Sequence, residues 1–151
     1  GDHSGRIEAV NADLLASLLE DGYVPVASPP MLGDEGEDAA PRYTAVNTDA
    51  DRASAAVAGE LGATLVSLTD VAGVYRDPDD PSTLIEEVAT PAAYEELKSA
   101  AEGFMGRKVM AATEALERGA SEVVVADANA DRPVRAALEG GGTHIHPEAI
   151  Q

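Results

Sequence analysis

Hydrophobic residues recur at helical spacing in several stretches of the chain, with short apolar runs between them. The leucines between residues 12 and 20 form one apolar stripe, which predicts a helix with Asn11 as its N-cap and Gly22 just past its end. An alanine-rich run after Asp51 predicts a second helix, which ends at Gly62. The first part of the chain is therefore predicted to hold two amphipathic helices.

Similar patterns continue to the last residues of the sequence. Further helices are predicted over 91–101, from a glycine-bearing break at 103–106 to residue 118, and over 133–138. Strands are predicted over 23–27, 64–69, 84–88, 121–126 and 143–146. Residues 28–44 are rich in proline, glycine and acidic side chains and predict a loop or an exposed hairpin.

This alternation of strands and helices is typical of an α/β fold. We expect one domain over residues 1–151, built on a mostly parallel sheet that helices cover on both faces. In such sheets ligands bind beyond the carboxyl ends of the strands. The predicted loops 27–51, 69–77 and 126–132 lie at those ends, and the break at 103–106 can reach the same side.

The chain is strongly acidic along its whole length. Its 151 residues include 28 acidic and 10 basic side chains, which gives a formal net charge of −18. This charge argues against nucleic acid or an anionic membrane surface as a general partner and favours a surface adapted to high salt. The chain has no cysteine, no apolar run of membrane-spanning length and no secretion-signal pattern at its first residues. We expect a cytoplasmic protein.

The segment Asn47-Thr48-Asp49-Ala50-Asp51 places three polar side chains two residues apart where the alanine-rich helix begins. A helix N-terminus has free N–H groups and partial positive charge, and so favours bound phosphate or carboxylate. One interpretation makes Thr48 or Asp49 the N-cap and Asp51 a residue that complements the helix dipole. The other places a binding site here.

The segment from Gly103 to Lys108 puts two adjacent cations, Arg107 and Lys108, at a helix start, where the helix dipole disfavours cations unless an anion is bound. The chain has only two lysines, Lys98 and Lys108, against eight arginines. An ordinary solvated lysine is the alternative interpretation.

Three further features have both a chemical and a plain structural interpretation. Gly73, in Asp70-Val71-Ala72-Gly73, could allow a nucleotide to approach the backbone closely, or could simply form a turn after a strand. Residues 76–82 are read as a turn and not as a calcium loop, because the ordered ligand spacing is missing. His144 and His146 share one face of a strand, which permits a metal pair, but surface or hydrogen-bonded histidines are favoured because no acidic or thiol ligand lies nearby in sequence.

Three motifs, in their order and spacing, resemble the C-terminal, nucleotide-binding half of the amino acid kinase family. They are residues 45–51 with the helix that follows, Leu68-Thr69-Asp70-Val71-Ala72-Gly73-Val74-Tyr75, and Gly103-Phe104-Met105-Gly106-Arg107-Lys108-Val109. Residues 1–6, Ser28-Pro29-Pro30, residues 107–112 and Gly142-Thr143 look most like the kinases that phosphorylate glutamate or aminoadipate on the acidic carrier protein LysW. The resemblance covers essentially the whole chain.

The resemblance implies a role for each matching position. Asn47 matches a substrate-binding asparagine, Asp51 an aspartate that orients catalytic lysines, and Lys108 the lysine that stabilises the transferring phosphoryl group. Nucleotide-binding positions are implied for the loop after the strand and for a segment near the adenosine: Asp70, Val71, Ala72, Gly73, Val74, Tyr75, Ala100, Ala101 and Glu102. If these roles hold, the ammonium group of Lys108 and the carboxylate of Asp51 should meet beside the sheet. No metal-ligating residue is implied.

The resemblance further implies an ATP-dependent kinase that uses Mg²⁺, converts a side-chain carboxylate to an acyl phosphate in arginine or lysine biosynthesis, and forms a homodimer. A LysW-type carrier protein would present the glutamate or aminoadipate. The family's N-terminal phosphate and substrate loops have no counterpart here, so we expect this chain alone to bind nucleotide without catalysis. The loop 33–44 is longer than the family pattern. The alternatives are another amino acid kinase, such as N-acetylglutamate kinase, or a non-catalytic nucleotide-binding module.

Overall fold

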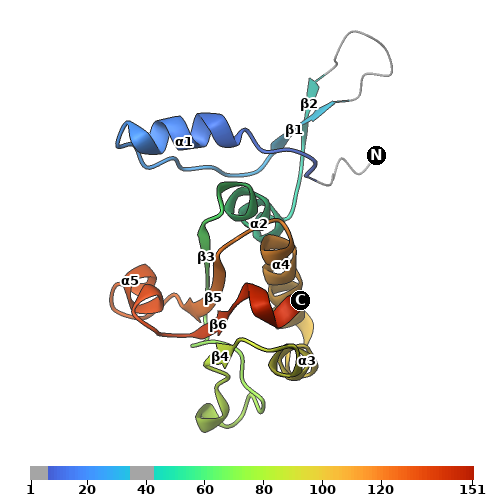
Figure 1. The fold of residues 1–151 in the computed structure, drawn as a ribbon, viewed down its shortest axis with the longest axis vertical. Coiled ribbons are helices and arrows are strands. Elements are labelled where there is room, and N and C mark those ends of the chain that lie inside the picture. The colour runs from blue at the N-terminus through green and yellow to red at the C-terminus, as the bar shows by residue number, and fades with distance from the viewer. Residues whose placement is uncertain (1–6, 35–42) are drawn as a thin grey trace.

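A computed structural model describes residues 7–34 and 43–151 and has a four-stranded sheet at its centre (Figure 1). The strands lie in the order β3 (Thr64–Thr69), β5 (Glu122–Asp127), β6 (Thr143–Ile145) and β4 (Glu87–Val88). The pairs β3–β5 and β4–β6 are parallel, whereas β6 runs antiparallel to β5. The mostly parallel sheet expected from the sequence is confirmed, with one reversed pairing at its middle.

Helices cover both faces of this sheet (Figure 1). On one face lie α2 (Ala50–Leu61), α3 (Pro91–Ala100) and α4 (Gly103–Glu117), and the main core forms there around Leu97, Val123 and Ile145. On the other face α5 (Pro133–Leu138) packs its Ala137 against Val124 and Ala126 of β5. The α/β architecture predicted from the alternating pattern is therefore confirmed.

Local signals account for where these helices begin and end. Asp49 is the N-cap of α2, and its side chain accepts a hydrogen bond from the Arg52 N–H at 3.1 Å. Gly62 ends α2 in the left-handed conformation, with a φ of 60°, which glycine adopts without strain. Thr90 caps α3, and Pro91 occupies its first turn, where no N–H is needed.

An arm formed by α1 (Ala12–Glu20) and the antiparallel hairpin of β1 (Met31–Asp34) and β2 (Tyr43–Val46) lies beyond α2, away from the sheet (Figure 1). The hairpin confirms one of the two alternatives expected for 28–44. Much of the long 33–44 loop falls outside the described residues. Between the arm and the helix α2 lies a largely apolar cavity of about 1030 Å³.

The strand predicted over residues 23–27 is wrong, because this segment forms no strand. Val24 and Val26 are 85% and 94% exposed, and nothing in the described part of the chain pairs with them. Alternating apolar residues form a strand only beside another strand, and Pro25 has no N–H to donate to one. The predicted strand 84–88 is shorter than expected: Leu84 forms an isolated bridge with Tyr75, and β4 contains only Glu87 and Val88.

Two short 3₁₀ helices complete the fold, at Pro81–Thr83 and Pro147–Ile150. The second contributes Ala149 to the main core, beside α3 and α4. Among the described residues, no helix combines the length and the apolar character that crossing a membrane requires.

Candidate active site

Lys108 and Asp51, which lie 57 residues apart in the chain, form a direct ion pair. The Lys108 Nζ is 3.0 Å from Oδ1 of Asp51. Lys108 lies in the second turn of α4 and Asp51 in the first turn of α2, so the pairing of these two helices brings the charges together. The Lys108 side chain is 19% exposed and that of Asp51 37% exposed, so both charges are only partly shielded from water.

Ser67 of β3 is a second oxygen partner of Lys108, in a role that no local pattern in the sequence predicts. Its hydroxyl lies 3.3 Å from the Lys108 Nζ. The ammonium group is therefore held by one charged and one neutral oxygen, from a helix and a strand respectively. A small cavity of about 140 Å³ lies beside these three side chains. The only signal for Ser67 in the sequence is a hydroxyl in the middle of an apolar strand.

Asn47 lies between the end of β2 and the start of α2, and its side chain is exposed. No hydrogen bond joins it to Lys108 within the part of the chain that the structure describes. The neighbouring N-cap of α2 is Asp49, one of the two residues that the sequence left open for this position. The structure therefore gives Asp49 a structural role and leaves Asn47 facing solvent.

The loop after β3, residues 70–75, has an outward and an inward part. Asp70 and Val71 are exposed, whereas Gly73 and Val74 are buried. A Cβ atom at Gly73 would lie 2.6 Å from the Thr143 hydroxyl, and the Val74 N–H donates to that same oxygen at 2.8 Å. Close packing against β6 thus explains the glycine, and Asp70 and Val71 are the residues of this loop that face solvent.

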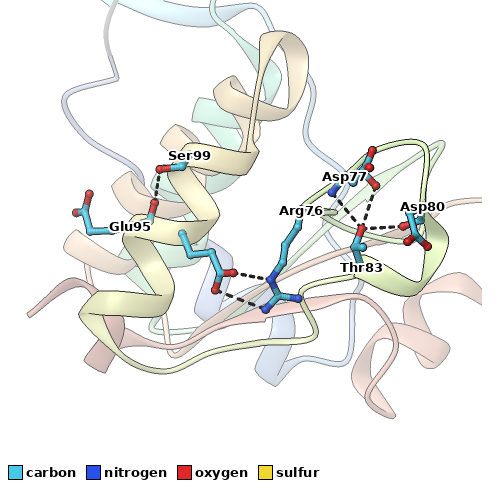
Figure 2. A network of polar contacts seen from close by, with 7 residues as sticks. Arg76, Asp77, Asp80, Thr83, Glu95 and Ser99 are labelled. Atoms are coloured by element: carbon cyan, nitrogen blue, oxygen red, sulfur yellow. Dashed lines mark hydrogen bonds and ion pairs between the residues drawn. The ribbon is translucent and has the colours of Figure 1, made fainter.

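Arg76 ties the segment that follows this loop to α3, as Figure 2 shows. Its guanidinium contacts both carboxylate oxygens of Glu96. The hydrogen bond from Arg76 holds the pKa of the Glu96 carboxyl below its usual range. The turn itself is closed by Thr83, whose hydroxyl accepts from the Asp77 N–H at 3.0 Å and lies 2.7 Å from the Asp80 carbonyl oxygen (Figure 2).

The segment between α3 and α4 contains the predicted adenosine-side residues. Ala100 ends α3, Ala101 is its C-cap, and both side chains pack against the main core. Glu102 is the exposed N-cap residue of α4 and makes no side-chain capping hydrogen bond. The alanines therefore position the backbone here, and Glu102 is the side chain that faces outward.

His144 of β6 and His146, the residue just after this strand, are paired with carboxylates from neighbouring strands. His144 Nδ1 lies 2.7 Å from Glu122 of β5, and His146 Nε2 lies 2.8 Å from Glu87 of β4. The local sequence does not indicate these partners, because they lie 22 and 59 positions away. Within residues 7–34 and 43–151, no group of three histidine or acidic side chains is arranged to hold a metal ion.

Comparison with known proteins identifies relatives along nearly the whole chain. Residues 2–127 match the model of the amino acid kinase family. The chain is 41% identical over 147 residues to a [LysW]-aminoadipate kinase of Thermus thermophilus, covering 96% of this chain and 52% of that protein. It is 44% identical over 144 residues to an acetylglutamate kinase of Methanopyrus kandleri, covering 93% and 53% respectively.

A solved structure shares the fold. The N-acetylglutamate synthase of Neisseria gonorrhoeae, in complex with coenzyme A and L-arginine, superposes with a TM-score of 0.75 at 29% identity. The match covers 97% of this chain and 33% of that one. The chain spans about half the length of the curated kinases that it matches.

Proposed function

Because this chain belongs to the amino acid kinase family, we propose that it supplies the nucleotide-binding half of an ATP-dependent kinase that phosphorylates a carboxylate. The single observation behind this proposal is the contact of Lys108 with Asp51 at the start of α2 and with Ser67 in β3. Phosphoryl transfer depends on positioning and on charge stabilisation, and a lysine held in place by neighbouring oxygens supplies both.

In the proposed reaction a carboxylate oxygen of the acceptor attacks the γ-phosphorus of ATP. A new oxygen–phosphorus bond forms, the bond from the γ-phosphorus to the bridging oxygen breaks, and ADP leaves with that oxygen. Lys108 would stabilise negative charge on the transferring phosphoryl group, and Asp51 would orient the ammonium group. Mg²⁺ bound to ATP takes its ligands mainly from phosphates and water, so we assign it no residue of this chain.

The nucleotide would lie against the solvent-exposed side of the same edge of the sheet. Asp70, Val71 and Glu102 are the exposed members of the predicted nucleotide-binding set, and Asn47 is the exposed residue beside α2 that would face the acceptor. Gly73, Val74, Ala100 and Ala101 would act through the backbone that they position. These assignments follow the resemblance at matching residues, together with the exposure of each side chain.

For the acceptor we propose glutamate or aminoadipate carried on a LysW-type protein. Support comes from the similarity to a [LysW]-aminoadipate kinase, together with the motifs at 107–112 and 142–143. A second candidate is N-acetylglutamate, which the 44% identity to an acetylglutamate kinase favours. The residues that distinguish these acceptors, the homodimer contact and the other phosphate loop would lie largely in the half of the enzyme that relatives have in addition.

The proposal is tested on the enzyme that contains both halves. ADP release is measured with ATP and, in turn, LysW-bound glutamate, LysW-bound aminoadipate and N-acetylglutamate. Phosphorylation of one acceptor supports the kinase and identifies its substrate. If ATP binds but no acceptor is phosphorylated, the chain belongs to a nucleotide-binding module instead.

Replacing Lys108 tests the site itself. We expect Lys108→Ala to lower kcat by about a hundredfold or more, equivalent to roughly 3 kcal/mol of transition-state stabilisation. Lys98→Ala is the matched control, because Lys98 is the other lysine and forms a surface ion pair with Glu95 on α3. Equal activity of the two variants would contradict the role of Lys108.

A further inference from the structure

The helices α2 and α4 meet along a seam made of small residues. Small residues of both helices lie in the buried core: Ala55, Ala58 and Gly59 from α2, and Ala111, Ala112 and Ala115 from α4. The approach is close, because a Cβ atom at Gly59 would overlap the Cβ of Arg118. Small side chains at the contact allow the two helices to approach closely.

Three ion pairs cross this seam, at successive positions along the helices. Lys108 meets Asp51 near the start of both helices, and Arg118 lies 3.9 Å from Glu60 near their ends. Between them Arg52 contacts Glu114 through two bonds, Nε to Oε2 at 3.0 Å and Nη2 to Oε1 at 2.9 Å. A paired contact of this kind fixes the relative orientation of both groups, which a single contact does not do.

We propose that Arg52 and Glu114 are positioning residues for Lys108. Arg52 is the next residue after Asp51, and Glu114 lies on the same helix as Lys108, six residues further on. The pair therefore joins the two helices that carry Lys108 and Asp51, at a point next to Asp51. By holding α2 and α4 in one rotation and register, it sets the 3.0 Å separation of the Lys108 ammonium group from Asp51. This inference rests on the proposed function.

The exposure of the pair suggests how its loss would appear in experiments. The Arg52 side chain is exposed and that of Glu114 is partly exposed, and ion pairs in contact with water contribute little to folding stability. Small displacements of a catalytic group, in contrast, reduce turnover strongly. Removing the pair should therefore change kcat far more than it changes the melting temperature.

The test uses the enzyme with both halves and measures kcat, KM for ATP and melting temperature. We expect Arg52→Ala and Glu114→Gln each to lower kcat about tenfold with little change in KM for ATP. The reversed pair, Arg52→Glu with Glu114→Arg, should recover most of the lost turnover. Glu60→Ala is the matched control: it removes an ion pair from the same seam, far from Lys108, and should leave kcat unchanged.

The outcomes separate this inference from the proposed function. If Lys108→Ala abolishes turnover while Arg52→Ala and Glu114→Gln keep full kcat, the positioning role is wrong and the kinase site stands. If Lys108→Ala has no effect, the proposed function itself fails. A loss of kcat that the reversed pair does not recover, accompanied by a lower melting temperature, would show a purely structural contact and overturn the inference.

Discussion

Thr143 is the buried polar residue that holds the loop after β3 in place. Its hydroxyl accepts the hydrogen bond from the Val74 N–H and occupies the space left by the missing side chain of Gly73. The sequence alone allows two interpretations of Gly73: a site where a nucleotide approaches the backbone, or a plain turn. Thr143, whose packing requires a glycine here, lies 70 residues further along the chain, at a distance that no local pattern reveals.

Replacing this hydroxyl should destabilise the protein. Thr143→Val keeps the shape of the side chain but leaves the Val74 N–H buried without a partner, so we expect a loss of about 1–3 kcal/mol in the free energy of unfolding. Denaturant titration measures the change. Thr143→Ser keeps the hydroxyl and serves as the control; equal losses in the two variants would assign the effect to the methyl group instead.

Between elements, the contact of Arg76 with Glu96 joins the turn after the loop to α3 (Figure 2). Because the folded state holds the pKa of Glu96 below its usual value, the folded protein binds a proton at this carboxylate less readily than the unfolded chain does. The stabilisation is complete above the ordinary glutamate pKa of about 4.3 and is lost as the pH falls through the lowered value.

The lowered pKa of Glu96 gives a prediction for the variant Glu96→Gln. The wild type should exceed the variant in unfolding free energy at pH 7, and the difference should shrink to nothing in acid, below the lowered pKa of the wild-type carboxyl. Denaturant titrations at pH 7 and at a series of lower pH values measure it. Arg76→Gln should remove the same pH-dependent difference, and a difference that did not shrink as the pH fell would mean that packing of Glu96 is responsible.

Elements with local signals were predictable, and those that depend on distant partners were not. The helix α2 follows from an alanine-rich period between Asp49 and Gly62, both of which act within a few residues of their own position. The segment 23–27 has the pattern of a strand but no neighbouring strand, and the reversed pairing of β6 leaves no trace in composition.

The candidate site shows the same division. The pairing of Lys108 with Asp51 was expected only because the motifs resemble a known family, since neither helix start alone identifies its partner. Ser67 and the pair Arg52–Glu114 were missed because their contacts span 41 and 62 residues. A serine in a strand and an arginine on a helix are common in any protein, so these side chains gain meaning only from the fold.

For the molecule as a whole, the net charge of −18 predicts a dependence of stability on salt. Like charges repel over roughly 10 Å at 0.1 M salt and over about 3 Å or less above 1 M, so added salt relieves repulsion in the folded state. We expect the melting temperature to rise between 0.1 M and 2 M KCl.

The slope of that rise should depend on surface carboxylates that make no ion pair in the described structure. Replacing Glu20, Asp79 and Glu117 with their amides removes three exposed negative charges and should make the melting temperature less sensitive to KCl. An unchanged slope would point to a salt effect other than charge screening, and a flat curve for the wild type would contradict the prediction outright.

The scarcity of lysine also has a practical use. A reagent directed at primary amines meets only two side chains in this sequence, Lys98, which is 43% exposed, and Lys108, which is 19% exposed and held by Asp51. Mass spectrometry of the labelled peptides would therefore follow each amine separately, with Lys98 as an internal reference. Protection of Lys108 by an added ligand would report occupancy of the site without any measurement of turnover.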